Sequence, residues 1–214
     1  MINGYIVDMD GTLVDSMALW DDLGSRFLRQ KHITPKANLK EILAPLSINQ
    51  AITYLINEYH LSQTVSQISQ EINMMLETIY TSEINLKPGA ADFIEQCFKQ
   101  NKKLCLLTAN NYQTTIKVLN KYNLTNKFDQ IITCDNVSLD KQNGAIYEYA
   151  AEQLGVLKDE CIVIEDAYHA ITSAKDACFK VWAVADLSNQ QDWDKICQIS
   201  DLYFNDMREM EVLI

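Results

Sequence analysis

Short apolar runs alternate with longer helical stretches after about residue 87, and this order limits the possible folds more than any other feature of the chain. The short runs are apolar and strand-like. Strands that alternate with helices are typical of a parallel sheet flanked by helices. The predicted strands are residues 5–8, 103–107, 130–133, 161–165, 180–184 and 202–204, and the predicted helices are residues 90–99, 113–122, 145–154, 167–177 and 190–199.

Residues 17–84 interrupt the alternation, because they contain successive helical patterns with no strand between them. Apolar residues recur at helical spacing within this segment, for example Ile68, Ile72, Met75, Leu76 and Ile79. We therefore predict an α/β protein with a Rossmann-like parallel sheet core, residues 1–16 and 85–214, and an inserted all-helical cap domain, residues 17–84.

The net charge of the 214-residue chain is −11 at pH 7, which argues against a nucleic-acid partner, because a polyanionic backbone requires basic surface. The same charge repels small anions at long range. Phosphate chemistry would therefore need local cations: a metal, a lysine or oriented backbone amides. No apolar stretch approaches the roughly 20 residues of a membrane span, so we expect no membrane partner.

Six cysteines are spread singly along the chain, without a C-x-x-C pair, and most of them lie inside apolar runs. Buried reduced thiols fit this pattern better than disulfides or a zinc site. The N-terminus has two acids in its first ten residues and lacks the basic start and apolar core of a secretory signal. We expect a cytoplasmic location and a monomeric state.

Polar residues lie at the carboxyl ends of four predicted strands, where ligands bind in open parallel sheets. An acid at a strand end is, taken singly, more often a helix cap, and a single lysine is usually solvated surface. Agreement of all four groups at one edge of the sheet favours a shared site. The residues are Asp8, Asp10, Gly11 and Thr12, then Thr108, Ala109 and Asn110, then Lys141, and finally Glu165 and Asp166.

The acids at this edge suit phosphoryl transfer with a magnesium ion. Asp8, Glu165 and Asp166 offer the hard oxygen ligands that Mg²⁺ prefers. With its charge partly neutralised, Asp8 can attack phosphorus without prohibitive repulsion. Asp10 can protonate the leaving oxygen and then deprotonate a water molecule.

The other residues at this edge can hold the phosphoryl group. Thr108 and nearby backbone amides can donate hydrogen bonds to its oxygens, and Lys141 can neutralise charge as it develops. Gly11 permits the tight backbone that brings amides close to the phosphate.

Four segments resemble the motifs of the haloacid dehalogenase superfamily, namely DMDGTLVDS, LLTAN, Lys141 with Ile146 and Tyr147 behind it, and VIEDAYHAI. The resemblance runs from residue 4 to about residue 185, and the first motif with its Thr12 is specific to members that transfer phosphate. The insert resembles the cap of the β-phosphoglucomutase and phosphoglycolate phosphatase branch, which closes over the substrate.

This resemblance implies a magnesium-dependent phosphatase that acts on a small phosphorylated metabolite, such as a sugar phosphate, through a phosphoaspartyl intermediate. Asp8 would be the nucleophile and Asp10 the acid and base, with Thr108 and Lys141 as phosphate binders. The implied magnesium ligands are Asp8, Asp10 through its carbonyl, Glu165 and Asp166, and the implied substrate-binding residues are Gly11, Thr12, Ala109 and Asn110.

The sequence departs from the family pattern in several places. Lys141 is followed by Gln-Asn-Gly where Pro-x-Pro is usual, so the loop that presents the lysine lacks its stiffening prolines. Ala167 stands where serine is common, Ala170 where glycine is common, and Cys178 replaces another usual glycine. These changes leave all four catalytic residue types in place.

Two other functions stay open. A sugar-phosphate mutase of the same family would return the phosphoryl group to a bound intermediate, and in such mutases a histidine stands at the position of Trp20. The Trp20 indole has one donor and no acceptor and does not titrate near neutral pH, which favours transfer to water. A signalling receiver domain gathers similar residues, but it accepts phosphate on a middle strand and has no large insert after the first.

Cap residues that set specificity are not identifiable from the sequence. Arg26, Lys31, Lys36 and Lys40 could meet an anionic group of the substrate, and solvated surface is the alternative for each.

Overall fold

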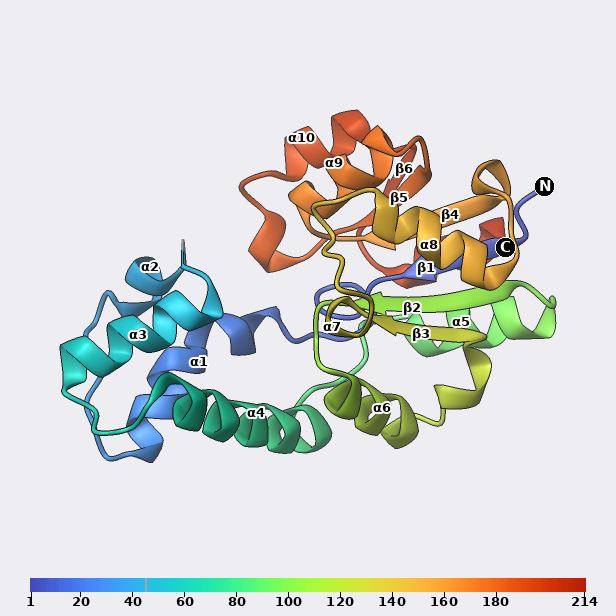
Figure 1. The fold of residues 1–214 in the computed structure, drawn as a ribbon. Coiled ribbons are helices and arrows are strands. Elements are labelled where there is room, and N and C mark those ends of the chain that lie inside the picture. The colour runs from blue at the N-terminus through green and yellow to red at the C-terminus, as the bar shows by residue number, and fades with distance from the viewer. Residues whose placement is uncertain (45) are drawn as a thin grey trace. The chain divides into compact units, whose positions relative to one another are not determined.

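Strand β1 (Gly4–Val7) lies inside a six-stranded sheet in the computed structural model, which describes residues 1–44 and 46–214 (Figure 1). The strand order is β3-β2-β1-β4-β5-β6, and each neighbouring pair is parallel. The predicted fold class, a parallel sheet core with an all-helical insert, is confirmed. The remaining strands are β2 (Lys103–Thr108), β3 (Gln130–Thr133), β4 (Cys161–Glu165), β5 (Lys180–Val184) and β6 (Leu202–Phe204).

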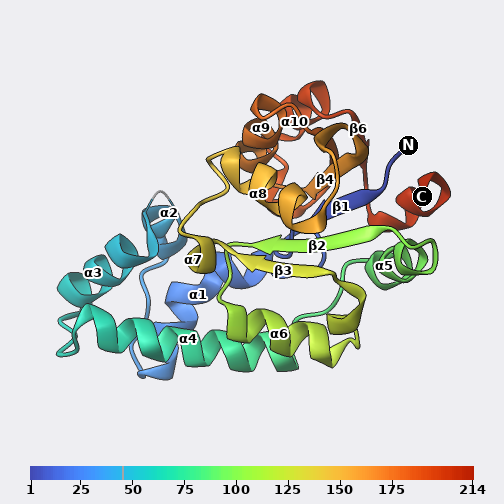
Figure 2. The same cartoon turned by 45° about the vertical axis from the view of Figure 1, so that its right-hand side comes forward.

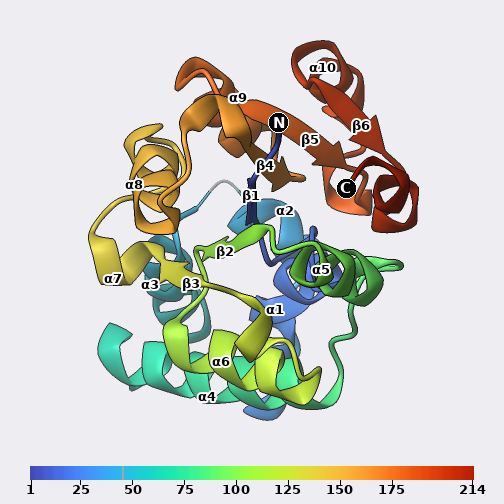
Figure 3. The same ribbon diagram turned by 90° about the vertical axis from the view of Figure 1, so that its right-hand side faces the viewer.

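Helices cover both faces of the sheet (Figure 3). One face packs Ile6, Leu107 and Val163 against α8, α9 and α10. On the other face, Tyr5 meets Phe93 of α5 edge to face, with ring centroids 5.4 Å apart. The core helices are α5 (Ala90–Lys99), α6 (Tyr112–Lys121), α7 (Cys134–Val137), α8 (Ala145–Leu154), α9 (Tyr168–Asp176) and α10 (Trp193–Ile199).

Burial on both faces explains why these strands are continuous apolar runs. All four residues of β1 and all five of β4 are buried. Polar residues are therefore confined to the strand ends. Figure 2 shows one such end, where the short helix α7 follows β3 beside β2.

The described part of the insert, which leaves out residue 45, has four helices. Residues Ala18–Glu83 form a compact unit of their own, apart from Met1–Met17 and Ile84–Ile214. Ser47 and Thr64 begin α3 and α4 with reciprocal capping boxes. The apolar stripe of α4 is buried in this unit and includes Ile68 and Ile72. The helices are α1 (Met17–Gln30), α2 (Leu39–Leu43), α3 (Ile48–Tyr59) and α4 (Val65–Ser82). Among the residues described, no helix has both the length and the apolar character needed to cross a membrane.

The two segments that join the insert to the core pair with each other. Val14 forms an antiparallel bridge with Leu86, and the Lys87 amide donates to the Leu13 carbonyl at 2.9 Å. The Lys87 ammonium then reaches the Asp186 carboxylate after β5, at 2.6 Å. These contacts fix the second connection to the sheet.

Candidate active site

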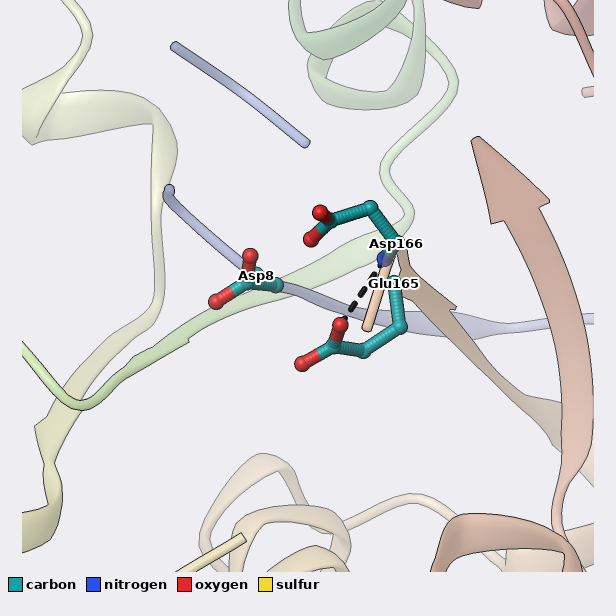
Figure 4. Close-up of side chains that lie close together, drawn as sticks. All are labelled: Asp8, Glu165 and Asp166. Atoms are coloured by element: carbon teal, nitrogen blue, oxygen red, sulfur yellow. Dashed lines mark hydrogen bonds between the residues drawn. The ribbon is translucent and has the colours of Figure 1, made fainter. Parts of the chain in front are cut away.

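Three carboxylates meet at the carboxyl ends of β1 and β4 (Figure 4). Asp8 follows β1, Glu165 is the last residue of β4, and Asp166 comes next. Because β1 and β4 are neighbours in register, these residues lie side by side, with one oxygen from each within 4.8 Å of the others. All three side chains are buried.

Lys141 enters this cluster from the loop between α7 and α8. Its ammonium donates to Asp8 Oδ1 and, at 2.7 Å, to Glu165 Oε1. Burial by itself lowers a lysine pKa, but the Asp8 and Glu165 carboxylates outweigh it and raise the pKa of Lys141 well above its usual value. The lysine is therefore charged at neutral pH.

Asp8 and Asp166 hold their protons more tightly than acids in water. Burial raises the pKa of Asp8 to about 7, with Lys141 opposing this and Glu165 adding to it. Burial, with Glu165 and Asp8 next to it, raises the pKa of Asp166 well above its usual value. Besides burial, the raised pKa values reflect repulsion between neighbouring carboxylates, which a bound cation would relieve.

The donor set fits a magnesium ion. Three carboxylates against one ammonium leave an excess of two negative charges when all are ionised, which one divalent cation neutralises. The ligand atoms are hard carboxylate oxygens, as Mg²⁺ requires, and no soft ligand lies among them.

The loop that carries Lys141 is held by side chains instead of prolines. Asp140 Oδ1 accepts a hydrogen bond from the Gln142 amide at 2.9 Å, and Asn143 Oδ1 accepts one from the Ala145 amide at 3.0 Å. Such turns restrain the backbone on both sides of the lysine. The missing Pro-x-Pro therefore does not keep Lys141 from the cluster.

Gly11 and Thr12 pack against Asp166. Gly11 has φ +88°, and a Cβ there would lie 2.4 Å from Asp166 Oδ2. The buried Thr12 hydroxyl donates to Asp166 Oδ1 at 3.3 Å. Both residues thus limit the position of this acid, and only glycine fits at position 11.

Asp10 is held at both of its carboxylate oxygens. Ser16 Oγ donates to Oδ1 at 2.6 Å, and Asn110 Nδ2 donates to Oδ2 at 3.3 Å. The Asn110 amide in turn donates to Thr108 Oγ1 at 3.0 Å, whereas Ala109 is exposed. The strand ends of β1 and β2 are joined in this way.

Ser16 is a site residue that we did not predict. It is fully buried and belongs to the segment DMDGTLVDS, so the sequence placed a hydroxyl near the acids. A serine six residues after Asp10 does not by itself indicate a contact, and only the turn after β1 brings the two together.

The basic residues of the insert all pair with acids of the insert. Arg26 lies 2.9 Å from Glu83, and Lys40 lies 2.6 Å from Asp21. The Trp20 indole donates to the Tyr80 hydroxyl at 2.9 Å. The other pairs are Arg29 with Asp22, Lys31 with Glu71 and Lys36 with Glu58.

Residues 5–184 match the family described as haloacid dehalogenase-like hydrolase. The chain belongs to this family. The predicted membership, in the branch of the β-phosphoglucomutases and phosphoglycolate phosphatases, is confirmed.

Two relatives of this hydrolase are named as phosphatases. Hexitol phosphatase A of Escherichia coli is 27% identical over 85% of this chain and 82% of its own length. The phosphorylated carbohydrates phosphatase of Thermotoga maritima is 21% identical over 82% of both chains. The predicted enzyme class, a phosphoric monoester hydrolase, is confirmed.

A solved structure shares the fold. CbbY of Rhodobacter sphaeroides, crystallised in complex with phosphate, superposes with a TM-score of 0.80 at 18% identity. The superposition covers 98% of this chain and 96% of that chain.

Proposed function

We propose that this hydrolase is a magnesium-dependent phosphatase of small phosphorylated carbohydrates that works through a phosphoaspartyl intermediate on Asp8. The observation that carries the proposal is the buried cluster of Asp8, Glu165, Asp166 and Lys141, with Asp10 held close by on the same turn. The phosphatase relatives support the same class of substrate.

In the first step, an Asp8 carboxylate oxygen bonds to phosphorus and the ester oxygen leaves with its bonding electrons. Asp10 gives that oxygen a proton, so the alcohol departs neutral. Lys141 lies on Asp8 and balances charge near the phosphoryl group, while Thr108 at the end of β2 donates a hydrogen bond to it.

In the second step, Asp10 takes a proton from water, and the water oxygen attacks phosphorus. The bond to Asp8 breaks, inorganic phosphate leaves, and both carboxyl groups regain their starting states. Ser16 and Asn110 hold the two oxygens of Asp10 and thereby orient it for both proton transfers.

The residues that would hold magnesium are Asp8, Glu165 and Asp166 through carboxylates and Asp10 through its carbonyl. When bound, the ion would screen the carboxylates from the phosphate and polarise the phosphoryl oxygens.

Hydrolysis is favoured over a mutase reaction by Trp20. Its single donor is used by the Tyr80 hydroxyl inside the insert, so the side chain supplies no proton relay. We therefore propose water as the usual phosphoryl acceptor.

The charge pattern of the insert bears on the substrate. Each of its five basic residues pairs with an acid of the same unit. Because the insert has no surplus positive charge, a second phosphate or a carboxylate is disfavoured in the part of the substrate beyond the transferred phosphate. We expect that part to be neutral, such as a polyol or sugar. A hexitol phosphate has this character.

The test is a screen of hexitol phosphates, hexose phosphates, phosphoglycolate and sugar bisphosphates with Mg²⁺ and with a chelator, reading free phosphate. We expect Mg²⁺-dependent release of inorganic phosphate from monophosphates that carry no second charged group. β-Glucose 1-phosphate is incubated separately, with and without bisphosphate, and products are separated. Glucose 6-phosphate forming much faster than free phosphate would make the enzyme a mutase and contradict the proposal.

A cytoplasmic location and a monomeric state remain part of the proposal. All six cysteines are free thiols, which fits a reducing compartment. Sedimentation at enzyme-assay concentrations tests the monomer directly.

A further inference from the structure

Asn189 bridges the ends of two strands. It closes the short helical turn η3 (Leu187–Asn189) after β5, and it is 7% exposed. Its Nδ2 donates to the Asp166 carbonyl at 2.9 Å and to the Val184 carbonyl at 3.0 Å. Both hydrogens of the amide nitrogen are therefore used, one at the end of β4 and one at the end of β5.

The Asp166 carbonyl depends on this contact. β4 ends at Glu165, whose partner on β5 is Ala183, so Asp166 lies just beyond the paired part of the strand. A buried carbonyl at such a position needs a hydrogen bond from elsewhere. Asn189 supplies it from 23 residues farther along the chain.

The peptide between Asp166 and Ala167 is held at both ends. Asn189 Nδ2 donates to the oxygen of this peptide, which is the Asp166 carbonyl. The N–H of the same peptide, which belongs to Ala167, donates to Glu165 Oε2 at 2.9 Å. Because a peptide unit is planar and rigid, fixing its oxygen also fixes the direction of its N–H. By fixing this peptide, Asn189 also restrains the orientation of the Glu165 carboxylate. The other oxygen of that carboxylate accepts a hydrogen bond from Lys141.

Asn189 is itself fixed by its surroundings. Its side-chain oxygen accepts from the Asp186 amide at 3.2 Å, and the Asp186 carboxylate accepts from the Ser188 amide at 2.9 Å. The same carboxylate pairs with the buried Lys87 ammonium at 2.6 Å. The turn that presents Asn189 is therefore tied to the segment that joins the insert to the core.

We propose that Asn189 is a positioning residue for the magnesium site, which aligns the Glu165 and Asp166 carboxylates by holding the peptide between Asp166 and Ala167. The inference rests on the proposed function, because it takes these carboxylates as magnesium ligands. Partners of this kind, one step removed from a metal, orient its ligands and set the affinity of the site.

The test compares Asn189→Ala with the wild type in calorimetric titrations with Mg²⁺ alone, without substrate. We expect the Mg²⁺ dissociation constant to rise by roughly 10- to 100-fold. Phosphatase activity should need correspondingly more Mg²⁺ and should recover much of its kcat at saturation. Ile196→Val, a truncation in the buried core at α10, is the control for lost stability and should leave the Mg²⁺ dissociation constant unchanged.

If Asn189→Ala does not fold, Asn189→Ser keeps one donor at the position and should give a smaller shift in the same direction. A dissociation constant within the range of the control overturns the role of Asn189. A wild-type protein that binds no Mg²⁺ overturns the proposed metal site instead, so the two failures are distinguishable.

Discussion

Lys141 and Asp8 are each 8% exposed where they pair in the sheet core, whereas Lys40 and Asp21 in the insert are 58% and 45% exposed. Water screens the pair in the insert, so it contributes little to stability and is easily rearranged. The core pair is withdrawn from water, where an unbalanced charge is costly and each group shifts the pKa of its neighbour. The chemistry of this enzyme is thus expected where charges are buried together, and the insert is expected to tolerate changes of charge.

The largest effect is expected at Asp8, the proposed nucleophile. Asp8→Asn keeps the shape of the side chain but removes its negative charge, so phosphate release should fall by several orders of magnitude with the fold retained. Asp21→Asn in the insert is the matched control and should keep nearly full activity. Steady-state phosphate assays and circular dichroism decide this. Substantial turnover by Asp8→Asn would exclude the covalent mechanism.

Outside the cluster of Asp8, Glu165 and Asp166, a buried ion pair should likewise contribute more to stability than an exposed one. Lys87→Ala leaves the buried Asp186 carboxylate without its cation and should cost about 3 kcal/mol of unfolding free energy, the low end for a buried pair because Ser188 still donates to that carboxylate. Lys40→Ala should leave the urea midpoint unchanged within error. Equal midpoints for the two variants would show that burial does not separate these pairs.

The Mg²⁺ effect on stability should depend on pH. The folded pKa of Asp8, about 7, lies above the ordinary 3.8, so between these values the folded protein holds more protons than the unfolded one. Metal-free stability therefore falls as pH rises through this window, as Asp8 loses its proton in the crowded cluster. Mg²⁺ binds the ionised cluster, so it should raise the melting temperature more at pH 7.5 than at pH 5.5. An equal rise at both values would contradict this.

The smallest effect is expected in the insert. Arg26→Gln and Lys36→Gln should leave KM for a hexitol monophosphate nearly unchanged, because both side chains are already paired with Glu83 and Glu58. A marked rise in KM for either variant, measured beside Lys158→Gln of the core surface, would show that a cation of the insert contacts the substrate.

Sequence reasoning predicted the strands within a residue, because runs buried on both faces end sharply at polar residues. Helix starts were less predictable. α9 begins at Tyr168 and not at residue 167, and the Ala167 amide donates to the Glu165 carboxylate. The prediction for residues 190–199 began three residues early, since α10 starts at Trp193 after the η3 turn. The four residues of α7 are too few to show a helical period.

Site residues at strand ends were predictable because parallel strands place their carboxyl ends together. Residues that hold the acids were not. Asn189 contacts Asp166 through backbone atoms, and Ser16 meets Asp10 only after a turn, so neither contact has a motif of its own. The roles assigned to the predicted site residues stay predictions until the variants above are measured.

The place of β1 in the sheet has a consequence for how the chain folds during synthesis. β1 is made before its two neighbours, yet Gly4 pairs with Lys103 on one side and Cys161 on the other. One edge of this apolar strand therefore stays open until β2 is made, and the other stays open until β4 is made, after more than half of the chain. Pairings so distant in sequence slow folding. The nascent enzyme is thus expected to depend on chaperones until β4 emerges, because Asp8, Lys141 and Glu165 come together only then.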